Sequence, residues 1–137
     1  MGDRGHVEII SEGDPTLYYY THWGASGLPT DVADALHRGK GRWDDPEYLN
    51  RIIFSEMIKD SVLSDTGYGI GFHQHGDVWR IVTIDHVNKT AGIKEVNYDK
   101  VDWSNYNQDD VVWDWKLEPV PFEVFVYLNS LVTAKEQ

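Results

Sequence analysis

The order of secondary-structure patterns along the 137-residue chain constrains its fold more than any other feature. Two segments with strand patterns come first, two helical segments follow, and four strand patterns precede a last segment that favours a helix. Runs of strands and runs of helices, rather than strict alternation, are typical of an antiparallel sheet with helices on one face. We therefore predict a single α+β domain over 1–137, with about five to six strands in an antiparallel sheet and two to three helices packed on one face.

The first part of the chain predicts a hairpin and a short helix. β-branched and aromatic residues at 7–11 and 17–23 flank turn-forming residues at 12–15, which predicts a β-hairpin. Thr30 is the expected N-cap of the short helix that follows, and Gly39 is expected to end it.

The clearest helix begins at Asp45 and extends to about Lys59. Asp45 is a natural N-cap, Pro46 stands where proline is best tolerated, and Glu47 complements the helix dipole. Apolar residues at helical spacing indicate that one side of this helix is buried. They are Leu49, Ile52, Ile53 and Met57, with Phe54 and Ile58 widening the stripe.

Strand patterns dominate the second half of the chain. At 67–72 apolar residues alternate with glycines, so one face is bare backbone that a helix, another chain or a ligand can approach closely. Residues 78–86 predict a central strand with 93–98 as its hairpin partner, and 111–117 predict a half-buried strand. The segment 121–133 fits a helix or a strand, and we favour the helix.

The charge balance bounds the possible partners. Twelve basic residues against 23 acidic residues give a formal net charge of −11, which repels phosphate backbones and anionic lipids. We therefore expect a basic protein partner, and neither direct nucleic-acid binding nor membrane binding. The alternative is that the acidity only keeps the protein soluble.

The absence of cysteine excludes disulfides, thiolate zinc sites and cysteine nucleophiles. The chain also has no long apolar run and no signal-peptide pattern at its start, so we expect a cytoplasmic location.

The stretch 99–118 is the best candidate for a protein-binding surface. It interleaves carboxylates with aromatic rings, as a surface that docks a basic protein groove would. The alternative is a solvated loop whose rings fold inward. The predicted partner-binding residues are Trp103, Tyr106, Asp109, Asp110 and Asp114.

A histidine-rich segment offers an alternative site for a small ligand. His73 and His75 would point to one side of a strand, and Asp77 could add a carboxylate, as in part of a metal site. A turn signal at Gly76 and the lack of further ligands at a suitable spacing argue against a metal. We therefore predict no metal and no cofactor.

Two more places complete the alternative site. His22 and Trp23 lie beside a glycine-rich loop at 24–27, where the histidine could act as a general base or hydrogen-bond to the backbone. Arg42 precedes an aromatic ring and two carboxylates at 43–45, which form a cation–aromatic platform or simply cap the next helix.

The chain resembles a family of small bacterial and phage proteins with which no activity is associated. The resemblance rests on Tyr20–Trp23, on Arg42–Leu49 with Arg51–Phe54, and on Thr66–Ile70, and it covers roughly 17–93. It implies a phage or mobile-element context and carries over no catalytic residue.

These observations lead to three hypotheses of function. The first is an acidic, non-enzymatic interaction protein, such as a phage-type inhibitor of a host defence or nucleic-acid-handling protein. The second is a protein or enzyme that binds a nucleotide-like small ligand or a metal at the glycine-rich strand and the histidines. The third is an antitoxin or immunity protein.

Overall fold

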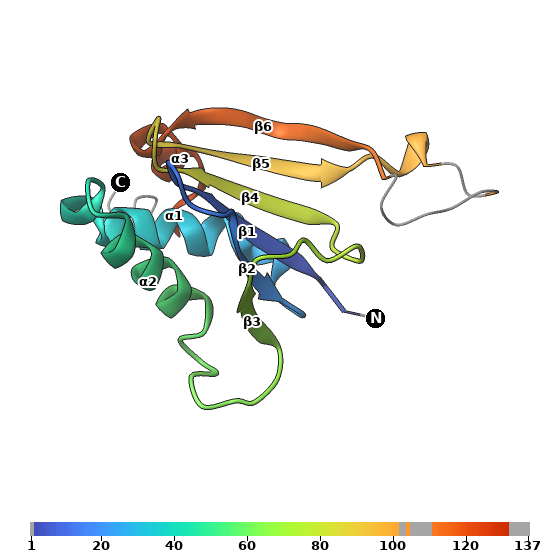
Figure 1. Cartoon of the computed structure of the whole chain (residues 1–137), viewed down its shortest axis with the longest axis horizontal. Helices are drawn as coiled ribbons and strands as arrows, with labels where there is room; N and C mark the ends of the chain where they lie inside the picture. Colours follow the sequence, from blue (N-terminus) through green and yellow to red (C-terminus); the bar gives the residue numbers. More distant parts are fainter. Residues whose placement is uncertain (1, 102–103, 105–110, 132–137) are drawn as a thin grey trace.

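A computed structural model of the chain describes residues 2–101, 104 and 111–131. Figure 1 shows a fan of strands with helices gathered at one side and one end. The strands are β1 (Gly5–Ile10), β2 (Leu17–Thr21), β3 (Tyr68–Gly71), β4 (Arg80–Asp85), β5 (Thr90–Val96) and β6 (Trp113–Pro121). The helices are α1 (Leu28–Arg38), α2 (Pro46–Met57) and α3 (Phe122–Asn129), with 3₁₀ turns η1 (Ala25–Gly27), η2 (Lys40–Arg42) and η3 (Tyr98–Lys100).

The six strands form one sheet in the order β3-β2-β1-β4-β5-β6. β1 and β2 pair as the predicted antiparallel hairpin, and the α+β class is confirmed. One detail differs from the antiparallel prediction, because β1 and β4 are parallel and the sheet is therefore mixed. The parallel pair arises because the connection 72–79 carries the chain from β3 past β2 and β1 before β4 begins.

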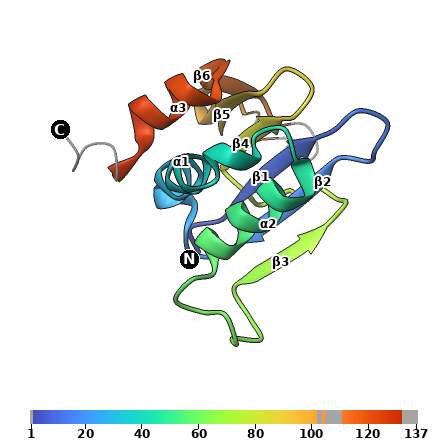
Figure 2. The same ribbon diagram turned by 90° about the vertical axis from the view of Figure 1, so that its left-hand side faces the viewer.

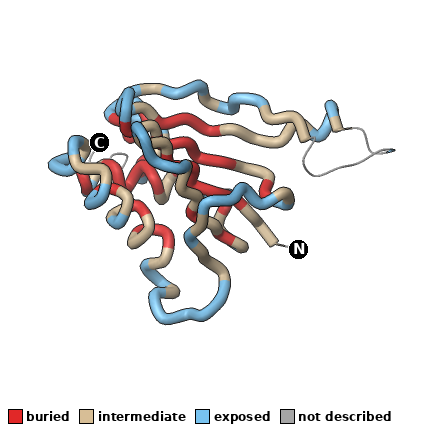
Figure 3. Tube along the Cα trace, viewed as in Figure 1, coloured by how far each residue is buried: buried red, intermediate tan, exposed pale blue. Residues whose placement is uncertain are grey.

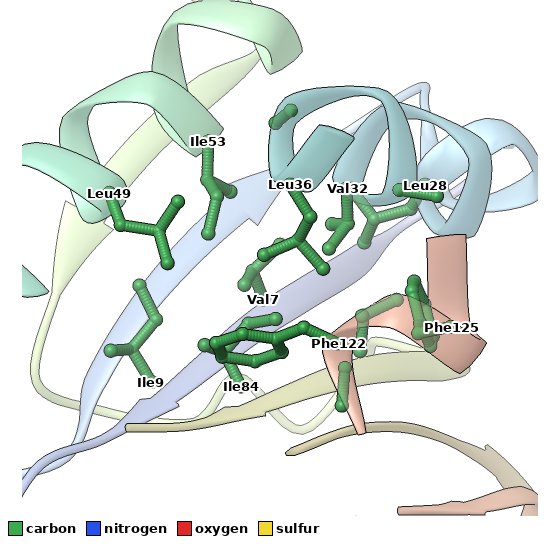
Figure 4. Close-up of a cluster of buried hydrophobic side chains, with 14 of the residues drawn as sticks. Val7, Ile9, Leu28, Val32, Leu36, Leu49, Ile53, Ile84, Phe122 and Phe125 are labelled. Carbon is green, nitrogen blue, oxygen red and sulfur yellow. The ribbon is translucent and has the colours of Figure 1, made fainter. Parts of the chain in front are cut away.

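The core lies between the sheet and the helices. Figure 2 shows α1 and α2 in front of the strands, and Figure 3 shows that the buried residues concentrate where these layers meet. Figure 4 shows side chains from both layers pointing toward one another. They include Val7, Ile9 and Ile84 from the sheet, and Leu36, Leu49, Ile53, Phe122 and Phe125 from the helices.

The predictions of α2 and α3 are confirmed, and the predicted start of α1 is wrong. In α2 the Asp45 side chain accepts a hydrogen bond from the Tyr48 amide, with Pro46 as the first residue, as predicted. In α1 the predicted N-cap at Thr30 is wrong, because the helix begins at Leu28 and Gly27 occupies the cap position. The 3₁₀ turn η1 runs directly into α1, so the chain is already helical before Thr30 is reached. The helix favoured for the C-terminal segment is present as α3.

The candidate functional site lies on the face of the sheet away from α1 and α2. Along β1 the side chains of Val7 and Ile9 enter the core, so His6 and Glu8 point to the other side.

No helix in the described ranges is both long enough and apolar enough to span a bilayer.

Candidate functional site

A pocket lies on this second face, over two glycines of β3. Gly71 pairs with Tyr18 and Gly69 pairs with Tyr20, so the glycines stand on the face where the two tyrosine rings project. A Cβ added at Gly71 would meet no atom within 4 Å, and at Gly69 only the Tyr20 Cβ, at 4.0 Å. The missing side chains leave a pocket of about 200 Å³. It is lined by His6, Tyr18, Tyr20, Gly69, Ile70, Gly71, Phe72, His73 and His75.

Aromatic rings form the walls of this pocket. The His6 ring lies 5.1 Å from the Tyr18 ring, 5.8 Å from the Tyr20 ring and 5.2 Å from the His75 ring, between centroids. Tyr20 and His75 are closer still, at 4.5 Å. Because His75 belongs to the connection 72–79, this ring contact holds the connection against the sheet.

His6 fixes the same connection through hydrogen bonds. Its side chain is fully buried, and its Nε2 accepts the backbone N–H of His75 at 2.9 Å. Nδ1 therefore carries the proton and donates to the Tyr19 carbonyl at 3.2 Å. Burial lowers the pKa of His6 to about 4, so the ring is neutral at physiological pH and has no free nitrogen for acid–base chemistry.

Beside His6, the Glu8 carboxylate is the centre of a second set of hydrogen bonds. Its carboxylate accepts hydrogen bonds from the Tyr18 hydroxyl at 3.2 Å, the Thr83 hydroxyl at 3.3 Å and the Lys94 ammonium at 3.2 Å. Burial and the neighbouring carboxylate raise the pKa of Tyr18 to about 12. Tyr18 is consequently a neutral phenol whose ring orientation is fixed by Glu8.

His22 forms the rim of the pocket next to Tyr20. Its Nδ1 accepts a hydrogen bond from Arg4 Nε at 3.2 Å and lies 3.3 Å from the Tyr20 hydroxyl. Arg4 also forms an ion pair with Asp77 at 2.8 Å. The Trp23 ring packs edge-on against His22, with centroids 4.9 Å apart.

Most of the predicted ligand-binding residues therefore meet in space. His73 and His75 line the pocket, and His22, Trp23 and Asp77 belong to the rim network. The structure does not bring Arg42 together with them. Arg42 ends η2, and its guanidinium lies over the Tyr48 ring at 4.6 Å, next to the start of α2.

Two residues on which the site is built, His6 and Glu8, are not among the residues predicted from the sequence. They form no cluster in the sequence, because apolar Val7 separates them. Their signal was the polar–apolar alternation of β1, which places both on one face of the strand. Tyr18 and Tyr20 carry the same signal in β2.

Of the five predicted partner-binding residues, the structure describes Asp114. Trp103, Tyr106, Asp109 and Asp110 lie outside the described residues. Asp114 is exposed, accepts a hydrogen bond from the Asn97 side chain at 2.6 Å and lies 3.9 Å from the Lys100 ammonium. The acidic docking surface at 99–118 therefore stays a prediction.

Within the ranges that the structure describes, no three His, Asp or Glu side chains converge as metal ligands. Comparison with protein-family models, with curated proteins and with solved structures finds no match for this chain. The resemblance to bacterial and phage proteins thus stays a prediction, and functional inference depends on the geometry of the pocket.

Proposed function

We propose that this protein binds a small ring-bearing molecule, nucleoside-like in size and shape, in the pocket over β3. One observation carries the proposal. Two glycines stand where side chains would otherwise fill the space between Tyr18, Tyr20 and the connection 72–79. A flat ring can lie against the exposed backbone and stack on the aromatic walls.

The polar groups support binding rather than catalysis. His6 and Glu8 already have their polar atoms engaged by neighbouring residues. His73 and His75 have no ring-nitrogen hydrogen bond within the described part of the chain, so their imidazoles are available to a ligand. Imidazole can donate or accept a hydrogen bond, which suits a heterocycle with both kinds of group.

The charge of the protein restricts the ligand further. A net charge of −11 disfavours polyphosphates and other strongly anionic ligands. Two charged groups next to the pocket are already neutralised, because Glu8 is paired with Lys94 and Asp77 with Arg4. The favoured ligand is accordingly neutral or weakly cationic, such as a nucleoside or an aromatic amine.

The test is a ligand screen combined with a variant that fills the pocket. Adenosine, guanosine, uridine, cytidine and tryptamine are screened by thermal shift, and hits are measured by isothermal titration calorimetry. Gly71→Val places a side chain in the open space over β3, where valine also suits a strand. Gly41→Val is the matched control, because its Cβ also meets no atom within 4 Å but lies in η2.

We expect at least one probe to bind the wild type and Gly41→Val with similar affinity. Gly71→Val should fold with similar thermal stability and bind that probe at least about tenfold more weakly, since the ring can no longer reach the backbone. Equal affinity in Gly71→Val, or no binding by any ring-bearing probe, would contradict the proposal.

A further inference from the structure

Helix α3 is apolar on both sides. Its inward side chains Phe122, Phe125 and Val126 are buried in the core. On the outward side, three apolar residues at spacings of three and one lie along one helical face, and a fourth, Leu131, follows just beyond the end of the helix at Asn129. These residues are Val124 (40% exposed), Tyr127 (67%), Leu128 (54%) and Leu131 (58%), and we name them the α3 stripe.

The stripe has the composition of an interface. Between Phe122 and Leu131 the only charged residue is Glu123. Surface helices normally present a polar outward face, and monomeric proteins rarely expose a contiguous apolar patch larger than a few hundred Å². The outward face of α3 departs from this pattern, which makes it a candidate for a protein-binding surface.

A preformed pocket borders the stripe. It has a volume of about 220 Å³ and is lined by His37, Lys40, Trp43, Glu123, Val126 and Tyr127. Trp43 is held rigidly, because its indole N–H donates to the Leu36 carbonyl at 2.9 Å and its ring packs edge-on against Phe122. A rigid pocket with an aromatic wall is suited to an anchoring side chain from a partner.

Carboxylates surround a second pocket next to this one. It has a volume of about 520 Å³, and none of its described lining residues is lysine or arginine. Segment 40–47 joins the two pockets, since Lys40 and Trp43 line the first and Asp45 and Glu47 line the second. The second pocket is lined by Ser11, Glu12, Asp14, Asp45, Pro46, Glu47, His86 and Val87.

We propose that the α3 stripe and the carboxylate pocket form one docking surface for a basic amphipathic segment of another protein. Apolar side chains of the partner cover the stripe and insert beside Trp43, and its lysines or arginines reach Glu12, Asp14 and Glu47. The charge pattern favours this occupant over a second copy, since two chains of net charge −11 with the same carboxylates repel each other. The surface shares no lining residue with the pocket over β3, so it is independent of the proposed ligand.

The experiment measures binding of a labelled synthetic helix with leucines on one face and lysines on the other. Fluorescence anisotropy gives its affinity, and a peptide with glutamates in place of the lysines is the charge control. Leu128→Ser tests the stripe, and the double variant Glu12→Gln/Glu47→Gln tests the carboxylates without touching the Asp45 cap. Leu63→Ser and Asp65→Asn are matched controls, since Leu63 is 98% exposed and Asp65 is exposed, and both lie in the loop before β3.

We expect the lysine peptide to bind, and Leu128→Ser to weaken it at least about tenfold. The carboxylate variant should bind more weakly and with a shallower dependence on salt, whereas the two controls should match the wild type. Equal binding of the glutamate peptide, or unchanged affinity in Leu128→Ser, would overturn the proposal. Sedimentation that shows a wild-type dimer lost in Leu128→Ser would overturn it as well, because a second copy would then cover the stripe.

Discussion

At the scale of single residues, the pocket depends on a neutral histidine and on glycines that differ in their roles. His6 joins β1 to the connection 72–79 by accepting the His75 amide, and donates to Tyr19 in the neighbouring strand. A Cβ at Gly71 would meet only open space, whereas Gly67 is required by its backbone conformation.

The pKa of His6 makes stability depend on pH in a defined direction. The folded value is about 4, and the ordinary value is 6.5. Between these values the unfolded chain binds the proton and the folded chain does not, so folding becomes less stable as pH falls from about 6.5 to 4. The loss amounts to about 3 kcal/mol in the free energy of unfolding.

The measurement compares the wild type with His6→Gln by urea unfolding between neutral pH and pH 4.5. We expect the stability gap between the two proteins to narrow as pH falls, because glutamine does not titrate. The charged neighbours His75, Glu8 and Asp77 are present in both proteins. Asp31 is also present in both proteins. Burial raises the pKa of Asp31 to about 6, so its protonation makes folding more stable as pH falls, in the opposite direction to His6. A gap that stays constant over this range would contradict the account of His6.

Substitutions at Gly67 and Gly71 should differ clearly in their effect on stability. Gly67 has a φ of +92°, and an added Cβ would lie 2.2 Å from Cζ3 of Trp23. We expect Gly67→Ala to destabilise the fold by about 1–3 kcal/mol through backbone strain and displacement of the indole. Gly71→Ala should change stability by less than about 1 kcal/mol, since nothing opposes its methyl group. Equal effects in chemical denaturation would show that the conformation at Gly67 is not required.

At the scale of elements, caps, turns and residue spacing were sufficient to predict several helices and strands. The capped helix α2, the first hairpin and α3 were all predicted from caps, turns and spacing. The start of α1 was predicted wrongly, because η1 sets helical dihedrals before the expected cap. In α2 the prediction holds because the helix's own N-cap side chain supplies a terminating hydrogen bond.

Removal of the N-cap side chain of α2 tests whether its hydrogen bond stabilises the helix. Asp45→Ala removes the side-chain acceptor for the Tyr48 amide and should lower stability by about 1 kcal/mol. Asp44→Ala is the neighbouring control, because that side chain is 85% exposed and pairs with Lys89 on the surface, and such a pair is worth about 0–1 kcal/mol. An Asp45→Ala effect no larger than that of the control would show that the cap does not stabilise α2.

At the scale of the whole molecule, the site emerges from contacts that no local pattern encodes. The alternation in β1 and β2 indicates which residues share a face, but it does not tell which strands become neighbours. Only the parallel pairing of β1 with β4 brings the connection 72–79 over His6 and Tyr20. For this reason the histidines could be named as candidates from the sequence, while the pocket that they line could not.

The net charge predicts how salt acts on the molecule. With 23 acidic and 12 basic residues, self-repulsion destabilises the compact state at low ionic strength. We expect the melting temperature to rise as sodium chloride is added, because the Debye length falls to about 8 Å at physiological salt. The double variant Glu12→Gln/Glu47→Gln should show a smaller rise. A melting temperature that does not change with salt would mean that repulsion contributes little to stability.

The most direct test of the pocket is a two-dimensional amide NMR titration with the best-binding ring-bearing probe. We expect the largest shifts on the amides of Gly69, Gly71 and His75, with changes in the ring resonances of Tyr18 and Tyr20, and we expect Gly71→Val to abolish them. Shifts that centre on other parts of the sheet or that persist in Gly71→Val would contradict the assignment of this pocket as the ligand site.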